Sequence, residues 1–183
     1  MEYLKSITPT FESVLEVGCG FGRITRLVLS NYPNTKRYKA VDLSPDQVSN
    51  AEEYVKSGID RSTLAHIDLT FAISDIKSLQ MNLKYDLVLA SEVLLHILPS
   101  EIKEIMIKLV ELSNCHIINI DYYSEKLNQL APHNFLHQYE KIYSEIPHIA
   151  KVQRVPIRKT GLFGFDTTQS IFHAIKEVRP TSS

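Results

Sequence analysis

Apolar residues in this chain form short runs separated by stretches with helical spacing, and this alternation predicts an α/β fold. Compact apolar runs indicate strands, whereas apolar residues three and four positions apart indicate helices. The predicted strands cover residues 13–17, 38–42, 68–73, 85–90, 115–120, 152–157 and 168–176, and the predicted helices cover 22–31, 45–56, 100–110 and 133–146. Strands that alternate with helices favour a doubly wound, mostly parallel seven-stranded sheet with right-handed crossovers. The turn-rich residues 159–164 predict that the last two strands form a C-terminal antiparallel hairpin at or near an edge.

The composition narrows the class of protein without identifying a ligand. The 183 residues suit one domain over 1–183, and 44% of them are hydrophobic. The 20 basic and 21 acidic residues nearly cancel, so nothing in the net charge attracts nucleic acid or an anionic membrane. No apolar run approaches the roughly 18 residues of a membrane span, and the first residues lack the apolar core of a signal peptide. Only two cysteines are present, so we expect a reduced, cytoplasmic protein without a metal site.

A glycine-rich loop follows the first predicted strand and is the clearest functional signal. Residues 14–23 read Val-Leu-Glu-Val-Gly-Cys-Gly-Phe-Gly-Arg. Glycines at alternate positions permit positive φ values and let a ligand approach the backbone. The helix that follows offers free N–H groups and a positive dipole end to an anionic group. These features predict a nucleotide or nucleoside site at the carboxyl ends of the strands.

The spacing of the glycines helps to choose the ligand. A nicotinamide dinucleotide fingerprint would place its third glycine at Arg23, but here it stands one residue earlier, at Gly22. A phosphate-binding Walker loop would need wider glycine spacing and a lysine. Asp42 ends the second strand and could accept both ribose hydroxyls, while Asp75 follows the third strand and could accept from an adenine amino group.

Four motifs in this order resemble those of the class I S-adenosylmethionine-dependent methyltransferases, small-molecule branch. The first is residues 14–23, and Val41-Asp42-Leu43-Ser44 is similar to the second. Ser74-Asp75-Ile76 is similar to the acidic position beside adenine, and residues 85–97 resemble the fourth-strand motif. The resemblance covers residues 13–121 in register, and the closing hairpin suits the same family. It implies a Rossmann-like methyltransferase fold and S-adenosylmethionine as cofactor.

The resemblance also implies roles for individual residues. Glu16 would order the loop, the loop backbone would cradle the cofactor, and Arg23 would pair with the methionine carboxylate. Asp42 would hold the ribose, Leu43 would pack on adenine, and Asp75 with Ile76 would meet the adenine edge, while Ser91 and Glu92 would flank the methionine portion. The implied cofactor-binding residues are Glu16, Gly18, Cys19, Gly20, Gly22, Arg23, Asp42, Leu43, Asp75, Ile76, Ser91 and Glu92.

No catalytic residue is assigned by the sequence, but four are candidates. His96 either faces the transferred methyl group or caps the next helix. Tyr122, Tyr123 and His137 either act as a general base or shape the acceptor pocket. His133 and His137 lie four apart on a predicted helix and could share an ion, but a metal needs more ligands, so a substrate-side or surface role is preferred.

Two other groups of residues have plainer interpretations. Cys115 opens an apolar strand and is predicted to lie in the core. Lys151, Arg154, Arg158 and Lys159 form a basic cluster without acids, which on a hairpin indicates a solvated face more often than a phosphate or RNA contact.

The acceptor is less defined than the cofactor. Residues 91–94 lack the Asn/Asp-Pro-Pro-aromatic run of DNA amino-methyltransferases, which favours a small-molecule acceptor. Relatives acting on small molecules often carry a cap before the first strand or an insertion after the fifth, whereas here segment 122–147 is modest. The cofactor pocket is therefore open on one side, closed by a second copy or a partner subunit, or covered by that segment. The alternative function is a methyltransferase-like binding module that needs or activates a partner chain.

Overall fold

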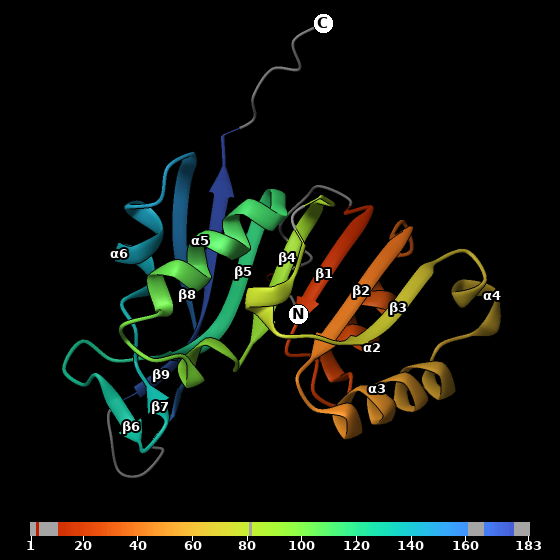
Figure 1. Cartoon of the computed structure of the whole chain (residues 1–183), viewed down its shortest axis with the longest axis horizontal. Helices are drawn as coiled ribbons and strands as arrows, with labels where there is room; N and C mark the ends of the chain where they lie inside the picture. Colours follow the sequence, from red (N-terminus) through yellow and green to blue (C-terminus); the bar gives the residue numbers. More distant parts are fainter. Residues whose placement is uncertain (1–2, 4–10, 81, 161–166, 178–183) are drawn as a thin grey trace, which may run out of the picture.

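The fold is built on a seven-stranded sheet whose strand order reverses beside the first strand. The computed structural model describes residues 3, 11–80, 82–160 and 167–177. Within these residues the order is β3-β2-β1-β4-β5-β9-β8 (Figure 1). The strands are β1 (Ser13–Val17), β2 (Arg37–Asp42), β3 (Asp68–Ile73), β4 (Tyr85–Ser91), β5 (Ser113–Tyr123), β8 (Ile149–Thr160) and β9 (Thr167–Lys176). Strands β1 to β5 are parallel, and β9 is antiparallel to both β5 and β8, which confirms the predicted fold class.

Helices cover both faces of this sheet (Figure 1). They are α2 (Arg23–Asn31), α3 (Pro45–Gly58), α4 (Arg61–Leu64), α5 (Ile102–Leu112) and α6 (Tyr139–Ser144), with 3-10 turns η1 (Ile76–Ser78) and η2 (Leu94–His96). Leu109 of α5 and Tyr143 of α6 belong to one core cluster, while Val28 of α2 and Ala51 of α3 belong to the other. In the described part of the chain, no helix is long and apolar enough to cross a membrane.

Residues 87–90 of strand β4 form a continuous apolar run, and their packing shows why. Val88 and Ala90 belong to the core cluster under α5 and α6, whereas Leu87 and Leu89 belong to the cluster under α2 and α3. All four side chains are almost completely buried. A parallel strand that is covered on both faces has no solvent side and therefore no polar alternation.

Helix α3 begins where its sequence predicts. The Ser44 hydroxyl accepts a hydrogen bond from the Gln47 backbone N–H at 3.3 Å, and Pro45 occupies the first helical position. Such a cap stabilises a helix by about 1 kcal/mol. It fixes the turn that directly follows Asp42 at the carboxyl end of β2.

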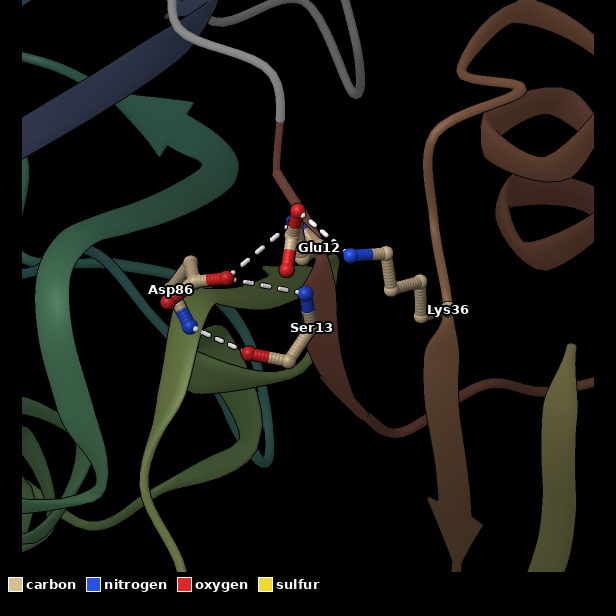
Figure 2. Close-up of polar contacts among 4 residues, drawn as sticks. All are labelled: Glu12, Ser13, Lys36 and Asp86. Carbon is tan, nitrogen blue, oxygen red and sulfur yellow. Dashed lines mark hydrogen bonds and ion pairs between the residues drawn. The ribbon is translucent and has the colours of Figure 1, made fainter.

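A polar network fastens the opposite edge of the sheet, where β1 and β4 begin (Figure 2). The backbone N–H groups of Glu12 and Ser13 both donate to Asp86 Oδ2, at 3.1 and 2.9 Å, and the Asp86 N–H donates to the Ser13 hydroxyl at 3.0 Å. Lys36 pairs with Glu12 at 2.8 Å. Burial raises the pKa of Asp86, but hydrogen bonds from Ser13, Asn114 and Glu12 outweigh it and lower the pKa below its ordinary value. This polar network fixes the register of β1 against β4.

The helix predicted over residues 133–146 is wrong in its first half. Residues 129–135 form a separate hairpin of β6 (Gln129–Ala131) and β7 (Asn134–Phe135), and α6 starts only at Tyr139. His133 has a φ of +69° in the hairpin turn, which is incompatible with a helix. His133 and His137 therefore do not share a helix face. Figure 1 shows the hairpin beyond the lower end of β9, on the side where β5 ends.

Three smaller expectations also differ from the structure or lie outside it. Arg154 of the basic cluster does have an acidic partner, because its Nε lies 3.5 Å from a Glu140 carboxylate oxygen. Its guanidinium also lies 4.1 Å from the centre of the Tyr123 ring. Cys115 is half-buried rather than a core residue. Residues 161–164 of the predicted turn lie outside the described residues.

Two histidines form a buried pair where β5 meets β9. His116 Nδ1 lies 2.9 Å from His173 Nε2, and His173 Nδ1 lies 3.0 Å from the Tyr3 hydroxyl. Burial, with the neighbouring charges of His116 and Lys151, lowers the pKa of His173 to about 4. Burial also lowers the pKa of His116, although the charge of Asp86 opposes this. Both imidazoles are therefore held neutral inside the fold.

The histidine pair makes stability depend on acid pH. Below about pH 6.5 a histidine in the unfolded chain binds a proton, whereas folded His173 stays neutral down to about pH 4. The free energy of unfolding therefore falls as the pH falls through this window. In His173→Gln this part of the loss disappears, and thermal unfolding at pH 7.5, 6 and 5 measures the difference. Exposed His66→Gln is the control and keeps the wild-type slope. Parallel slopes for His173→Gln and wild type would contradict the assignment.

Candidate functional site

The glycine loop between β1 and α2 has the geometry that its sequence predicts. Gly18, Gly20 and Gly22 all have positive φ values, of 69°, 53° and 87°. The backbone N–H groups of Gly18 and Cys19 both donate to the Val41 carbonyl, at 2.8 and 3.0 Å. A Cβ on Gly18 would lie 2.2 Å from Val93 Cγ2, whereas one on Gly20 would meet nothing within 4 Å. The loop is therefore packed tightly at Gly18 and open at Gly20.

Asp42 connects this loop to the end of β2. Its Oδ2 accepts from the Gly20 N–H at 2.9 Å, and its Oδ1 accepts from the Ser44 N–H at 3.0 Å. Each carboxylate oxygen has a second lone pair, so the half-buried side chain keeps accepting capacity for two further donors. A pair of neighbouring hydroxyls fits that capacity.

Glu16 lies beneath the loop and is fully buried. Its Oε2 accepts from the Thr25 hydroxyl at 2.5 Å and from the Tyr38 hydroxyl at 2.6 Å, which ties β1 to α2 and β2. Burial raises the pKa of Glu16 to about 7, although these two hydroxyls and the charge of Arg23 lower it. Arg23 is exposed at the start of α2. Burial likewise raises the pKa of Cys19 to about 12, so its thiol stays protonated.

The ends of β2 and β3 present apolar side chains to solvent. Leu43 is 69% exposed, Ile73 is 59% exposed, and Phe21 of the glycine loop is 48% exposed. Asp75 is exposed and accepts from the Lys77 N–H at 2.9 Å, while Ile76 is buried. Sequence reasoning selected Leu43 but missed Phe21 and Ile73. An apolar residue at a strand end beside a glycine loop is the signal that could have found them.

The end of β4 is held in a strained conformation. Glu92 has a φ of +57°, which is uncommon for any residue with a side chain. Its N–H donates to the Ile120 carbonyl at 2.8 Å, and its Oε1 accepts from the Gln169 side-chain amide at 2.8 Å. Ser91 is half-buried beside it. Gln169 had no signal in the sequence, because it lies 77 residues from its partner.

The four catalytic candidates lie in different surroundings. Tyr122 pairs with Gln169 across β5 and β9 at the carboxyl edge, whereas the Tyr123 ring lies under the Arg154 guanidinium and beside Phe172. His96 is exposed, and its Nδ1 lies 3.3 Å from the His133 carbonyl.

His137 is the buried member of these candidates. Its Nε2 lies 3.1 Å from the Leu94 carbonyl and 3.0 Å from the Ile97 carbonyl. Burial lowers the pKa of His137, although the two carbonyls oppose that shift. The structure therefore places this imidazole against the backbone of η2.

A second buried carboxyl lies at the end of β5, and the sequence assigned it no role. The Asn119 amide donates to Asp121 Oδ2 at 3.1 Å, and the Tyr143 hydroxyl donates to Asn119 at 3.1 Å. Among the described residues, Asp121 Oδ1 and the Tyr139 hydroxyl are buried without a hydrogen-bond partner. Burial, reinforced by the charge of Glu92, raises the pKa of Asp121 to about 8, although Asn119 and the Leu95 backbone oppose the shift.

In the part of the chain that the structure describes, no three histidine, cysteine, aspartate or glutamate side chains gather closely enough to hold an ion.

Two of the three positive-φ glycines, Gly18 and Gly20, allow a matched test of the tight contact. Gly20→Ala should lose about 1 kcal/mol of stability from the left-handed backbone alone. Gly18→Ala should lose about 1–3 kcal/mol more, because its Cβ also collides with Val93. Urea unfolding of both variants measures the difference. Equal losses would contradict the contact.

Asp121 should make the protein less stable as the pH rises. Between about pH 4 and about pH 8 the unfolded carboxyl is ionised while the folded one keeps its proton, so folding stability falls with rising pH. Asp121→Asn cannot ionise and should lose this part of the slope in urea unfolding at pH 5, 7 and 9. Exposed Asp75→Asn serves as the control with an unchanged slope. If Asp121→Asn keeps the wild-type slope, the carboxyl is ionised in the fold.

Solved structures of methyltransferases share this architecture. The magnesium protoporphyrin IX methyltransferase of Synechocystis PCC 6803 with bound SAM has a TM-score of 0.66 and 20% identity, over 96% of this chain and 74% of that one. The N-methyltransferase NodS of Bradyrhizobium japonicum with S-adenosyl-L-homocysteine has a TM-score of 0.68 and 17% identity, over 94% of this chain and 81% of that one. At these identities the likeness establishes the fold.

Sequence comparison gives the family. A malonyl-[acyl-carrier protein] O-methyltransferase of Acetivibrio thermocellus is 35% identical over 78 residues, which are 43% of this chain and 24% of that protein. The match thus spans about a quarter of the length of that relative. Residues 14–114, more than half of the chain, match the family described as methyltransferase domain. The glycine loop, Asp42 and the end of β4 all fall within that match, and the chain belongs to the methyltransferase domain family.

Proposed function

We propose that this protein is a class I methyltransferase that transfers the methyl group of S-adenosylmethionine to a small-molecule acceptor. The observation that carries the proposal is Asp42, which links the glycine loop to the end of β2 and keeps two accepting lone pairs for a ribose diol. It lies next to the β1–β4 reversal of strand order, where ligands of doubly wound sheets bind. The family match supports the same function.

The side chains around the loop fit the parts of this cofactor. The open space at Gly20 leaves room for a ligand against the backbone. Exposed Leu43 and Ile73 offer an apolar surface to adenine, and Asp75 lies nearby along the chain for its amino group. Arg23 offers a cation to the methionine carboxylate. Glu16, being buried against Thr25 and Tyr38, acts by ordering the loop.

The chemistry of the reaction asks the protein mainly for alignment. The cofactor supplies a sulfonium methyl group that is already activated for transfer. The chain then needs to hold an acceptor in line with it and to exclude water. Ser91 and Glu92 at the end of β4 flank the methionine portion of the cofactor, and Tyr122 of β5 and Gln169 of β9 are the residues we place on the acceptor side.

The proposed class of acceptor is inferred from the names of the relatives. Their names specify a malonyl-[acyl-carrier protein], a magnesium protoporphyrin and an N-methylated substrate. These acceptors differ in their reacting atom but none is named as a nucleic acid. We therefore propose a small-molecule acceptor, with its atom open between oxygen and nitrogen.

A second copy or a partner subunit would complete the site on its open side. The exposed Phe21 side chain supports this proposal, because it is an apolar group at the ligand site to which no part of the cofactor has been assigned. The free thiols of Cys19 and Cys115 suit a reducing compartment, which supports a cytoplasmic location.

The cofactor assignment is tested by titration calorimetry with S-adenosylhomocysteine. We expect a dissociation constant in the range of about 1–100 µM. Asp42→Ala should weaken binding about 100-fold, because it removes two charge-assisted hydrogen bonds. Gly20→Ala should also weaken binding although it collides with no protein atom. Asp46→Ala, an exposed change in the first turn of α3, is the control.

The outcomes separate the two functions considered for this chain. Wild-type protein that binds no S-adenosylhomocysteine would overturn the proposal. Binding with methyl transfer to carboxylate, hydroxyl or amine acceptors supports an enzyme. Turnover only together with a co-purified second chain would instead support the binding module that needs a partner.

A further inference from the structure

We infer that His137 is a positioning residue. It holds the η2 turn by the backbone carbonyls of Leu94, the first residue of the turn, and Ile97, which caps it, and thereby sets Val93 against Gly18 of the glycine loop. The inference deepens the proposed function, on which its meaning for cofactor binding rests. Sequence reasoning treated His137 as a candidate base. The structure gives it a different task.

The contacts fix which ring nitrogen carries a proton. Nε2 lies 3.1 Å from the Leu94 carbonyl and 3.0 Å from the Ile97 carbonyl. Carbonyl oxygens only accept hydrogen bonds, so Nε2 must be the protonated nitrogen and donates to both. In this tautomer the lone pair lies on Nδ1, and the Nε2–H is committed to the backbone of Leu94 and Ile97. The role that we infer for His137 rests on these two carbonyls.

The η2 turn needs such an outside donor. It is a single turn of 3-10 helix, closed by the His96 N–H to the Val93 carbonyl at 3.0 Å and the Ile97 N–H to the Leu94 carbonyl at 3.1 Å. Hydrogen bonds of 3-10 geometry are weak, and short 3-10 pieces depend on their surroundings. Leu94 is buried and Ile97 is half-buried, so the His137 donor reaches two carbonyls that have little access to water.

The His137 ring is itself held in place. It is 5% exposed, and its centre lies 5.5 Å from the Tyr139 ring in an edge-to-face arrangement. The preceding residue, Leu136, donates its N–H to the Asn128 carbonyl at 2.8 Å. The imidazole is thus fixed between the β6–β7 hairpin and α6, which makes it a rigid anchor for η2.

The turn transmits its position to the glycine loop through Val93. This residue immediately precedes η2, and its Cγ2 occupies the space in which a Gly18 Cβ would lie, 2.2 Å away. On the other side of Val93, the strained Glu92 is held by Gln169. Val93 is therefore fixed from both sides, by Gln169 acting on Glu92 and by His137 acting on η2.

Two replacements of His137 separate hydrogen bonding from packing. His137→Gln keeps an N–H donor at nearly the same reach, whereas His137→Leu keeps apolar volume and removes the donor. Leu136→Ala, next along the chain, is the control for a loss of packing alone. His66→Leu repeats the chemical change at an exposed position outside η2 and the β6–β7 hairpin.

The first readout is amide hydrogen exchange of His96 and Ile97, which needs no cofactor. The second is the dissociation constant of S-adenosylhomocysteine. In His137→Leu both amides should exchange at least about tenfold faster and the cofactor product should bind about tenfold more weakly, as expected for the loss of a buried donor. His137→Gln and His66→Leu should stay within about threefold of wild type, and Leu136→Ala should lower the melting temperature without changing the affinity.

Each result decides the role of His137. Unchanged exchange in His137→Leu, or equal loss of affinity in Leu136→Ala at a similar melting temperature, would overturn the inference. If His137→Leu does not fold, His137→Gln decides: wild-type exchange and affinity support the donor role, and fast exchange overturns it. If wild-type protein binds no S-adenosylhomocysteine, the proposed function fails, while the exchange measurement still tests His137.

Discussion

The contact between Gly18 and Val93 is the constraint on which the carboxyl edge of this sheet depends. Strands β1 and β4 are neighbours at the reversal of strand order, and the segments that leave them must pass each other closely. Only a residue without a side chain fits at Gly18, because the space of a Cβ is already occupied by Val93. The position of the glycine loop and the position of the end of β4 are therefore fixed relative to each other. Asp42 holds the glycine loop through Gly20, and Gln169 holds the end of β4 through Glu92.

Much of this architecture could be predicted because it follows from local patterns. Residues 87–90 of β4 are all apolar because successive residues face two different cores, and the cap at Ser44 sets the start of α3. Parallel strands bring their carboxyl ends to one edge, so the ends of β1, β2 and β4 were expected to meet there. The positions of Asp42 and Glu92 in the structure agree with that reasoning. Their roles toward a ligand stay predictions.

The remaining features depend on contacts between distant parts of the chain. Phe135, Leu136 and Tyr139 fit a helical period, yet the positive φ of His133 and the pairing of β6 with β7 override that pattern. The role of His137 becomes visible only when η2, some 40 residues earlier, lies against it. The role of Gln169 likewise becomes visible only in the fold, because its partner Glu92 lies 77 residues earlier in the chain.

Strand β9 runs against its neighbours, so its first residues, among them Gln169, lie at the edge where the parallel strands end. During synthesis the glycine loop and Asp42 leave the ribosome long before this strand does. At about 5–20 residues per second, roughly 4–15 s separate Glu92 from its partner Gln169. Throughout that interval the partly made chain has the loop and the acidic residue but cannot fix Glu92. The order of the strands along the chain thus delays completion of the site until nearly all of the sheet has been synthesised.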